Sequence, residues 1–278
     1  MRTPKAKKVP FYKIQGNGND FILIDNRRNI LQGRGLSALA KQVCHRNRSV
    51  GADGLIVIVP PADRRKADFK WRFFNADGSE AEMCGNGSRC AARFAVLRKI
   101  ARKSMAFETL AGIIHAEVKK DTVRVQLTGA TGQRMNIPVA LDFGTRTGHF
   151  INTGVPHVVY LSGDLGTEDV QSIGSATRHH EIFRPAGTNV NFIQVDGRHR
   201  LRIRTYERGV EGETLACGTG AVAAALIAAS LEKAASPVTV TTRGGDRLIV
   251  SFTRTGDSFA DLRLEGAAEV VCEGTLYI

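Results

Sequence analysis

The sequence has no apolar stretch long enough to cross a membrane. Its longest uninterrupted apolar run covers residues 221–229, whereas a membrane-spanning helix needs about 20 such residues. The N-terminus is basic, with Arg2, Lys5, Lys7 and Lys8, but no apolar segment of signal-peptide length follows it. We therefore expect a cytoplasmic protein with no membrane partner.

Cysteine is scarce, with five residues in a chain of 278. An odd number without an export signal argues against a framework of structural disulfides. The spacings also differ from those of zinc sites, since Cys84 and Cys90 on one helix would point about 120° apart. We therefore expect no bound metal, and the thiols are either catalytic or buried.

Aromatic residues are also few, at 6% of the chain, although Lys and Arg exceed Asp and Glu by 39 to 27. Basic clusters occur at residues 64–66 and 98–103. However, the chain has no aromatic-plus-basic RNA signature, no zinc-finger spacing and no recognisable DNA-reading helix. This pattern predicts a solvated basic surface and no nucleic-acid partner.

The sequence does contain one set of four blocks twice, in the same order. The offset between the copies stays between 133 and 138 positions, which a chance match of one block would not explain. The pairs are Gly16 with Gly154, Gly51 with Gly187, Cys84-Gly-Asn-Gly with Cys217-Gly-Thr-Gly, and Thr109–Gly112 with Thr242–Gly245. The chain therefore reads as two copies of one unit.

Each copy combines short β-prone runs with one principal helix that begins at its Cys-Gly-x-Gly segment. The second of these helices, expected over residues 220–231, is apolar nearly all round and should be buried on every side. The expected strands are residues 21–25, 55–59, 71–74, 113–118, 123–127, 158–161, 190–195, 201–206, 238–242, 248–252 and 262–264.

We therefore predict an α/β (α+β) fold with two pseudo-symmetric domains from an internal duplication. In each domain a mostly antiparallel or mixed sheet wraps around a central helix. The N-terminal domain is expected over residues 1–129 and the C-terminal domain over residues 130–267. The last strand, residues 268–278, is expected to return to the N-terminal domain and pair with its first strand.

The two Cys-Gly-x-Gly segments indicate acid–base chemistry. Free N–H groups and the positive end of the dipole at a helix start lower a thiol pKa and bind carboxylates. Cys84 and Cys217 are therefore predicted to face one α-carbon from opposite sides, so that one removes its proton and the other returns one. Cys44, Cys90 and Cys272 lack this context and are expected to be buried and inert.

A nucleotide-binding alternative rests on residues 218–223, which fit G-x-G-x-x-A. That motif should directly follow a strand and precede an acidic residue by about 20 positions. The nearest expected strand ends about ten residues earlier, and residues 238–242 contain no acid. We reject this reading.

Five motifs together closely resemble diaminopimelate epimerase, from about Phe11 to the C-terminus. They are Gly18-Asn19-Asp20-Phe21, Phe74-Asn75-Ala-Asp-Gly-Ser-Glu80, Met83-Cys84-Gly-Asn-Gly-Ser-Arg-Cys90, Tyr206-Glu207-Arg208-Gly209 and Ala216-Cys217-Gly-Thr-Gly220. Asn86 favours this family over the related proline racemases. The resemblance implies a cofactor-independent isomerase, usually a homodimer, that interconverts LL- and meso-2,6-diaminopimelate in lysine and peptidoglycan synthesis.

The resemblance also implies roles for individual residues. Cys84 and Cys217 are the acid–base pair; Asn86 and the backbone of Gly85, Gly87, Gly218 and Thr219 hold the reacting carboxylate. Arg208, Asn75 and Asn189 bind the distal carboxylate, Glu207 binds the distal ammonium, and Asn19 lines the reacting end. His157 is either a residue that orients the site through a hydrogen bond or a satisfied buried histidine.

Two positions depart from the family pattern. Val155 stands where many members have an Asn that contacts the distal carboxylate, and Gly54 stands where some have Gln. Two other functions therefore stay open: a racemase of the same fold for another amino acid, such as histidine, and a non-catalytic amino-acid-binding protein.

Overall fold

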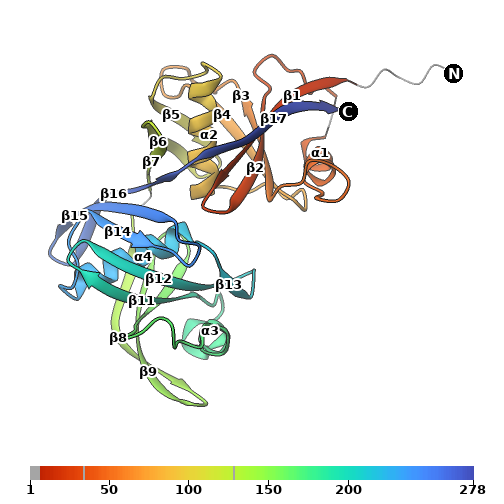
Figure 1. Cartoon of the computed structure of the whole chain (residues 1–278). Coiled ribbons are helices and arrows are strands. Elements are labelled where there is room, and N and C mark those ends of the chain that lie inside the picture. The colour runs from red at the N-terminus through yellow and green to blue at the C-terminus, as the bar shows by residue number, and fades with distance from the viewer. Residues whose placement is uncertain (1–6, 34, 128) are drawn as a thin grey trace. The chain divides into compact units, whose positions relative to one another are not determined.

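The computed structural model describes residues 7–33, 35–127 and 129–278, so that Arg2 and Lys5 of the basic N-terminus lie outside the described residues. The chain forms two compact units (Figure 1). The first is Met1–Val125 together with Gly266–Ile278, and the second is Gln126–Glu265. None of the described helices is long and apolar enough to cross a membrane.

The described residues of the first unit form two α-helices and strands from both ends of the chain. The helices are α1 (Leu36–Val43) and α2 (Gly85–Leu97). The strands are β1 (Lys8–Gly16), β2 (Asn19–Asp25), β3 (Gly54–Val59), β4 (Phe69–Asn75), β5 (Ser104–Thr109), β6 (Gly112–Val118), β7 (Thr122–Gln126) and, from the C-terminus, β17 (Glu269–Tyr277).

The second unit contains helices α3 (Val170–His179) and α4 (Gly218–Ser230) and a 3₁₀ turn, η1 (Glu181–Phe183). Its strands are β8 (Thr131–Leu141), β9 (Gly144–Asn152), β10 (Pro156–Leu161), β11 (Asn189–Gly197), β12 (Arg200–Glu207), β13 (Gly212–Thr214), β14 (Val238–Thr241), β15 (Arg247–Thr255) and β16 (Ser258–Ala267).

The two units share one order of strand pairing, which confirms the predicted duplication. In the first, β1 pairs antiparallel with β2, β2 parallel with β3, β3 antiparallel with β4, β4 parallel with β5, and β5 antiparallel with β6. In the second, β9 to β12, β14 and β15 follow the same alternation of antiparallel and parallel pairs. Helices α1 and α3, and likewise α2 and α4, fall at equivalent places in this order.

The C-terminal strand completes the symmetry. Strand β17 pairs antiparallel with β1, from Lys8 opposite Tyr277 to Gln15 opposite Glu269. In the second unit, β8 pairs antiparallel with β9 and so has the place that β17 has in the first. The last residues of the chain therefore supply a strand to the unit that the first residues begin.

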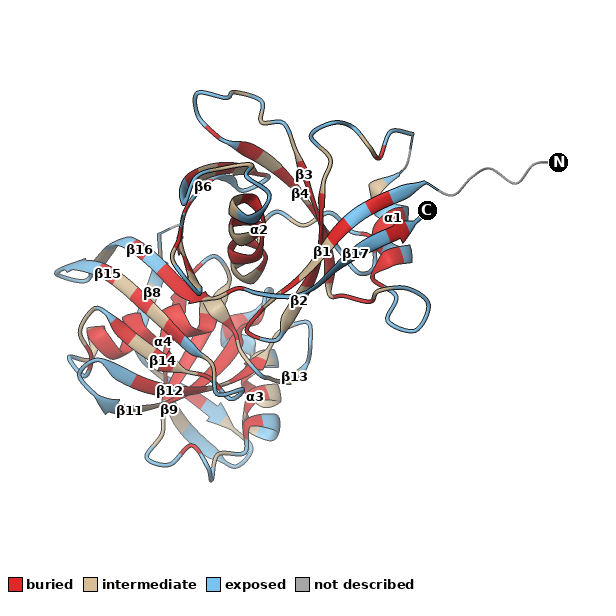
Figure 2. Cartoon of the chain, turned by 45° about the horizontal axis from the view of Figure 1, so that its top comes forward, coloured by how far each residue is buried: buried red, intermediate tan, exposed pale blue. Residues whose placement is uncertain are grey.

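Each central helix is buried by the sheet around it (Figure 2). Helix α2 packs against β1, β2, β3 and β6, and α4 packs against β9 to β12, β14 and β15. All ten residues from Gly220 to Ala229 are buried, as the all-round apolar sequence predicted. Shortening one of its fully buried side chains, such as Leu226, to Ala should cost about 2–5 kcal/mol of stability.

Equivalent glycines of the repeat have equivalent conformations. Gly51 has φ 73° and Gly187 has φ 65°, a left-handed region that disfavours residues with a Cβ. A Cβ on Gly51 would lie 2.6 Å from the Cα of Arg46, and one on Gly187 would lie 2.7 Å from the carbonyl oxygen of Arg178. These two turns therefore require glycine for both conformational and steric reasons.

Candidate active site

Cys84 is the N-cap residue of α2. Its backbone is extended, with φ −146° and ψ 122°, and its Sγ accepts a hydrogen bond from the Gly87 N–H at 3.4 Å. The sulfur therefore occupies the place that an Ser or Asp oxygen has in an ordinary N-cap. The helix N-terminus adds a positive potential there, which favours a thiolate or a nearby carboxylate.

Two amide side chains lie beside this thiol. The Cys84 Sγ is 3.8 Å from Asn19 Oδ1, and the Asn86 Nδ2 donates to the same oxygen at 3.5 Å. Asn19 is the first residue of β2 and Asn86 is the second residue of α2. Three predicted site residues thus come together in the first unit, as the motifs implied.

Asn75 lies at the end of β4 and is exposed, and its Nδ2 donates to Ser79 Oγ at 3.0 Å. Gly54 pairs with Asn75 across β3 and β4. A Cβ on Gly54 would lie 2.6 Å from Cε2 of Phe73 and 2.8 Å from the Phe74 carbonyl oxygen. The ring of Phe73 therefore fills the space that a longer residue at position 54 would need.

Cys217 is the N-cap residue of α4 and is buried, at 7% exposure. Its Sγ lies 3.5 Å from the Thr219 hydroxyl. Burial raises the pKa of the Cys217 thiol to about 12, and the nearby Glu207 carboxylate adds to the rise. The hydroxyl and N–H of Thr219 and the N–H of Gly220 act in the opposite direction. The expected lowering of this thiol pKa is therefore wrong for the protein alone, because loss of solvent outweighs the helix start.

Three of the predicted distal residues, Asn189, Glu207 and Arg208, lie in the second unit near the end of β12, whereas the fourth, Asn75, belongs to the first unit. Asn189 Oδ1 accepts from the Arg208 N–H at 2.8 Å, and its Nδ2 donates to the Pro156 carbonyl at 3.1 Å. The Arg208 Nη1 donates to the Ala186 carbonyl at 2.9 Å. Burial raises the pKa of Glu207, and the nearby Thr214 hydroxyl partly offsets the rise. Val155 lies between β9 and β10, and its carbonyl oxygen accepts a hydrogen bond from the Thr153 N–H at 3.1 Å.

His157 is fully buried in β10. Its Nδ1 lies 3.1 Å from Asn191 Nδ2, which makes Nδ1 the acceptor, while Nε2 has no hydrogen-bond partner among the described residues. Burial, with a smaller contribution from the Arg208 charge, lowers the pKa of His157 to about 3. His157 is therefore a neutral ring tied to Asn191.

Sequence reasoning missed several residues that hold these groups in place. Asp53 accepts from Asn19 Nδ2 at 2.6 Å, and Arg89 donates to Asn86 Oδ1 at 2.7 Å. In the second unit, Thr153 Oγ1 donates to the Thr219 carbonyl at 3.0 Å, and Asn191 lies under α4. The presence of Asp53 in the repeated Gly51 block, and of Arg89 within the first cysteine motif, was the available signal.

The three remaining cysteines do not behave alike. Cys44 and Cys90 are buried, as expected, and burial raises the pKa of Cys44 to about 12 and that of Cys90 further. Cys272 is exposed on β17. The expectation of burial was wrong there, because residues 269–275 of that strand all face solvent.

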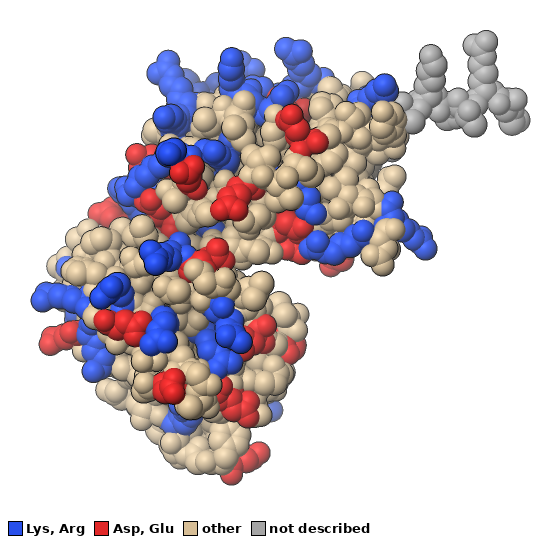
Figure 3. Space-filling model, in the orientation of Figure 1, with Lys and Arg blue, Asp and Glu red and all other residues tan. Residues whose placement is uncertain are grey.

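The basic clusters form a solvated surface, as predicted. Residues 64–66 are exposed, and so are Arg98, Lys99, Arg102 and Lys103. Figure 3 shows Lys and Arg side chains along the upper surface of the first unit, with Asp and Glu between them. Within the described ranges, no group of three or more His, Cys, Asp or Glu side chains is arranged to hold a metal ion.

Comparison with known proteins places these features in a family. The model of the family described as diaminopimelate epimerase matches residues 11–132 and 149–259. The chain belongs to the diaminopimelate epimerase family. The diaminopimelate epimerase of Aquifex aeolicus is 47% identical over 278 residues, covering 96% of this chain and 98% of that protein. That of a Hydrogenobaculum species is 46% identical over 274 residues, covering 95% and 97%.

Solved structures with low sequence identity share the fold of this diaminopimelate epimerase family member. A phenazine biosynthesis protein of the PhzF family from Bacillus anthracis matches with a TM-score of 0.75 at 15% identity, covering 98% of this chain and 100% of that one. A hydroxyproline epimerase from Agrobacterium vitis matches with a TM-score of 0.70 at 16% identity, covering 98% and 93%. The predicted two-copy α/β fold is thereby confirmed.

Proposed function

We propose that this chain is a cytoplasmic isomerase that interconverts LL- and meso-2,6-diaminopimelate for lysine and peptidoglycan synthesis. Family membership over nearly the whole chain supports the reaction. The observation that carries the mechanism is the placement of Cys84 and Cys217 at the N-caps of α2 and α4, equivalent helices of two units with one topology.

The proposed chemistry is a proton exchange at one α-carbon. One cysteine, as the thiolate, takes the α-proton and becomes a thiol, and the electron pair of the broken C–H bond stays on the substrate. The other cysteine, as the thiol, gives its proton to the opposite face and becomes the thiolate. Two residues are needed because a single base would tend to return the proton to the face from which it came.

The helix starts account for stabilisation of the charge that develops on the substrate. Gly85, Asn86 and Gly87 open α2, and Gly218 and Thr219 open α4, so their N–H groups are unpaired within the helices. A carboxylate attached to the reacting carbon would accept from these groups. These hydrogen bonds would strengthen as negative charge spreads onto the carboxylate in the transition state. Catalysis requires this stronger stabilisation of the transition state than of the bound substrate.

The distal end is the basis of the proposed selectivity. The Arg208 guanidinium suits a carboxylate, and the Glu207 carboxylate suits an ammonium group; Asn189 and Asn75 would add amide contacts. Because burial raises the Glu207 pKa, a substrate ammonium would supply the positive charge that favours its ionised form. Ionisation of Glu207 would also affect Cys217, because the Glu207 charge raises the pKa of the Cys217 thiol.

We also propose a homodimer in solution. Its support is three exposed apolar side chains on β17: Val270, Val271 and Tyr277 are 42%, 56% and 66% exposed. Sedimentation equilibrium of the wild-type protein beside a Val271→Lys/Tyr277→Lys variant tests this. A wild-type monomer, or a variant dimer of unchanged affinity, would contradict the assignment of that surface.

Interconversion of diaminopimelate isomers, followed by chiral chromatography, tests the proposed function. Purified protein is dialysed against a chelator and assayed with LL-diaminopimelate and with a panel that contains histidine, proline and lysine. We expect turnover of diaminopimelate alone, with no need for added pyridoxal phosphate, metal or nucleotide. Faster turnover of another amino acid would establish the racemase alternative, to which Val155 and Gly54 point; binding without turnover would establish a binding protein.

A further inference from the structure

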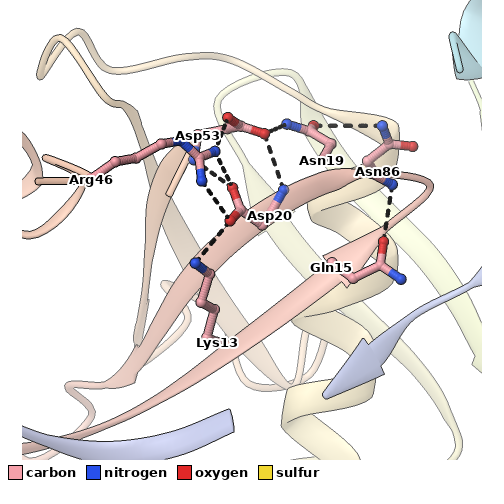
Figure 4. Close-up of polar contacts among 8 residues, drawn as sticks. Lys13, Gln15, Asn19, Asp20, Arg46, Asp53 and Asn86 are labelled. Carbon is pink, nitrogen blue, oxygen red and sulfur yellow. Dashed lines mark hydrogen bonds and ion pairs between the residues drawn. The ribbon is translucent and has the colours of Figure 1, made fainter. Parts of the chain in front are cut away.

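The amide groups beside Cys84 have orientations that their other partners dictate. Asn86 Oδ1 accepts from Arg89 Nη2 at 2.7 Å, so Asn86 presents its Nδ2 to Asn19. Asn19 donates its own Nδ2 to Asp53 Oδ2 at 2.6 Å, so it presents Oδ1 in return. Figure 4 shows Asn19 between Asp53 and Asn86 in this arrangement. The hydrogen bonds to Asp53 on one side and to Asn86 on the other therefore both orient the Asn19 Oδ1 toward the Cys84 thiol.

Both oxygens of the Asp53 carboxylate accept hydrogen bonds, and its side chain is 39% exposed. Its Oδ2 also accepts from the Asp20 N–H at 3.1 Å, and its Oδ1 accepts from Arg46 Nη2 at 2.8 Å. Asp20 in turn accepts from Arg46, from the Asp53 N–H and from Lys13 (Figure 4). One carboxylate oxygen of Asp53 faces donors from β2, and the other faces the Arg46 guanidinium. Tilting the carboxylate away from this position would therefore break some of these hydrogen bonds.

We propose that Asp53 is a positioning residue of the reaction: it fixes the Asn19 amide with its oxygen toward the Cys84 sulfur, so that the Cys84 proton has a defined acceptor and a defined direction. The inference rests on the proposed function only for the role of Cys84 in catalysis, because the geometry around the thiol is independent of the substrate.

Two contacts of the Cys84 sulfur favour opposite protonation states, the thiolate and the thiol. The Gly87 N–H stabilises the thiolate, whereas Asn19 Oδ1 stabilises the thiol by accepting from S–H. A residue that gives a proton in one direction of a reaction and takes it in the other requires such a balance. If Asn19 turned over, its Nδ2 would face the sulfur and both contacts would favour the thiolate.

Charged and titratable groups approach this site from each neighbouring element. They are Lys13 on β1, Asp20 on β2, Arg46 after α1, Asp53 before β3, and Arg89 and Cys90 on α2. A change at Asp53 therefore alters both the charge near the thiol and the orientation of Asn19. The test must separate these two effects.

The experiment measures the rate of alkylation of Cys84 by iodoacetamide against pH, by mass spectrometry of its peptide. Two variants are compared with wild type: Asp53→Asn, which keeps the shape and loses the charge, and Asp53→Glu, which keeps the charge and displaces the carboxylate. Both should lower the pH midpoint of alkylation, and at neutral pH they should raise the alkylation rate about three- to tenfold, as expected for loss of one hydrogen bond to the thiol. The kcat should fall by a similar factor, with a smaller change in KM.

Asp25→Asn is the matched control, because Asp25 is a carboxylate at the far end of β2, the strand that Asn19 begins, and its partner is Arg27. The decisive comparison repeats both Asp53 substitutions in an Asn19→Ala background. There the Asp53→Glu shift should disappear, and the Asp53→Asn shift should shrink to the part that the lost charge causes. Shifts of equal size in that background, or no shift for either folded variant, would overturn the proposal. Because alkylation needs no substrate, the outcome is distinguishable from a failure to turn over diaminopimelate.

Discussion

Two equivalent glycines of the duplicated helices should respond differently to the same substitution. Gly87 and Gly220 are each the third residue of a helix that Cys84 or Cys217 caps. A Cβ on Gly87 would lie 3.4 Å from Cys84 Cβ, Ile56 Cδ1 and Trp71 Cζ3, which is ordinary contact. A Cβ on Gly220 would lie 2.5 Å from Asn191 Oδ1. Only the second site requires a neighbour to move.

The neighbour at Gly220 cannot move without cost. Asn191 is fully buried; its Nδ2 lies 3.1 Å from His157 Nδ1 and donates to Val158 O at 3.0 Å, while its Oδ1 accepts from Thr205 at 3.0 Å. Leaving one or two of these groups unsatisfied costs about 1–3 kcal/mol each. Replacing Gly by Ala within a helix returns about 1 kcal/mol.

We therefore expect Gly220→Ala to lower the free energy of unfolding, by up to about 5 kcal/mol. Its kcat should also fall, because Asn191 supports the helix start that carries Cys217. Gly87→Ala should leave the stability unchanged or raise it by up to about 1 kcal/mol. Urea unfolding followed by circular dichroism measures both. Equal losses at the two sites, or a stable Gly220→Ala protein, would refute the packing argument.

Three further outcomes are expected. Cys84→Ala and Cys217→Ala should each reduce epimerisation by at least about 10³-fold, as expected for loss of an essential acid or base, whereas Cys90→Ala should retain turnover; full activity in either of the first two contradicts the two-thiol mechanism. The buried thiols Cys44, Cys90 and Cys217 keep their protons to higher pH when folded than when unfolded, so stability is unaffected below about pH 9 and falls above it by up to about 1.4 kcal/mol per pH unit per thiol. Urea unfolding at pH 8 and pH 10 measures this, and a flat profile would refute it. The His157 ring should stay neutral from pH 5 to pH 8, since its pKa is about 3; a midpoint in that range in its NMR titration would show that the ring is not buried as described.

The duplicated architecture could be predicted from the sequence because four blocks recur in the same order, so that each copy supports the interpretation of the other. The two Cys-Gly-x-Gly blocks predicted two helix starts, and both cysteines are N-cap residues. The all-apolar segment after Cys217 predicted a helix buried on every side, since no exposed face could be assigned to it. The return of the C-terminal strand to β1 was also correct.

The elements that the sequence analysis missed include helices α1 and α3 and the β8–β9 hairpin. Helix α1 has only eight residues and its N-cap, Gly35, makes no side-chain cap hydrogen bond. Helix α3 contains Gly174, which reads as a loop signal, yet a Cβ there would lie 2.5 Å from the Cβ of Tyr206. Glycine at that position is a packing requirement that only the folded chain reveals. The β8–β9 hairpin has many exposed residues, so its strands lack a clear apolar alternation.

The site was predictable as a list of residues and not as a network. The motifs named Asn19 and Asn86, but the orientation of each amide depends on Asp53 and Arg89, which come from other parts of the chain. The pKa of Cys217 was misjudged for the same reason. Its sequence context shows a helix start, whereas its burial and the nearness of Glu207 are properties of the folded unit.

The most direct test of the central claim, that two thiols act from opposite faces of one carbon, is deuterium incorporation from D₂O during early turnover of LL-diaminopimelate. The product meso isomer should carry solvent deuterium at one α-carbon, while substrate recovered at low conversion keeps its original hydrogen. Equal labelling of recovered substrate and product, or product that retains the substrate hydrogen, would contradict a mechanism with two separate proton carriers.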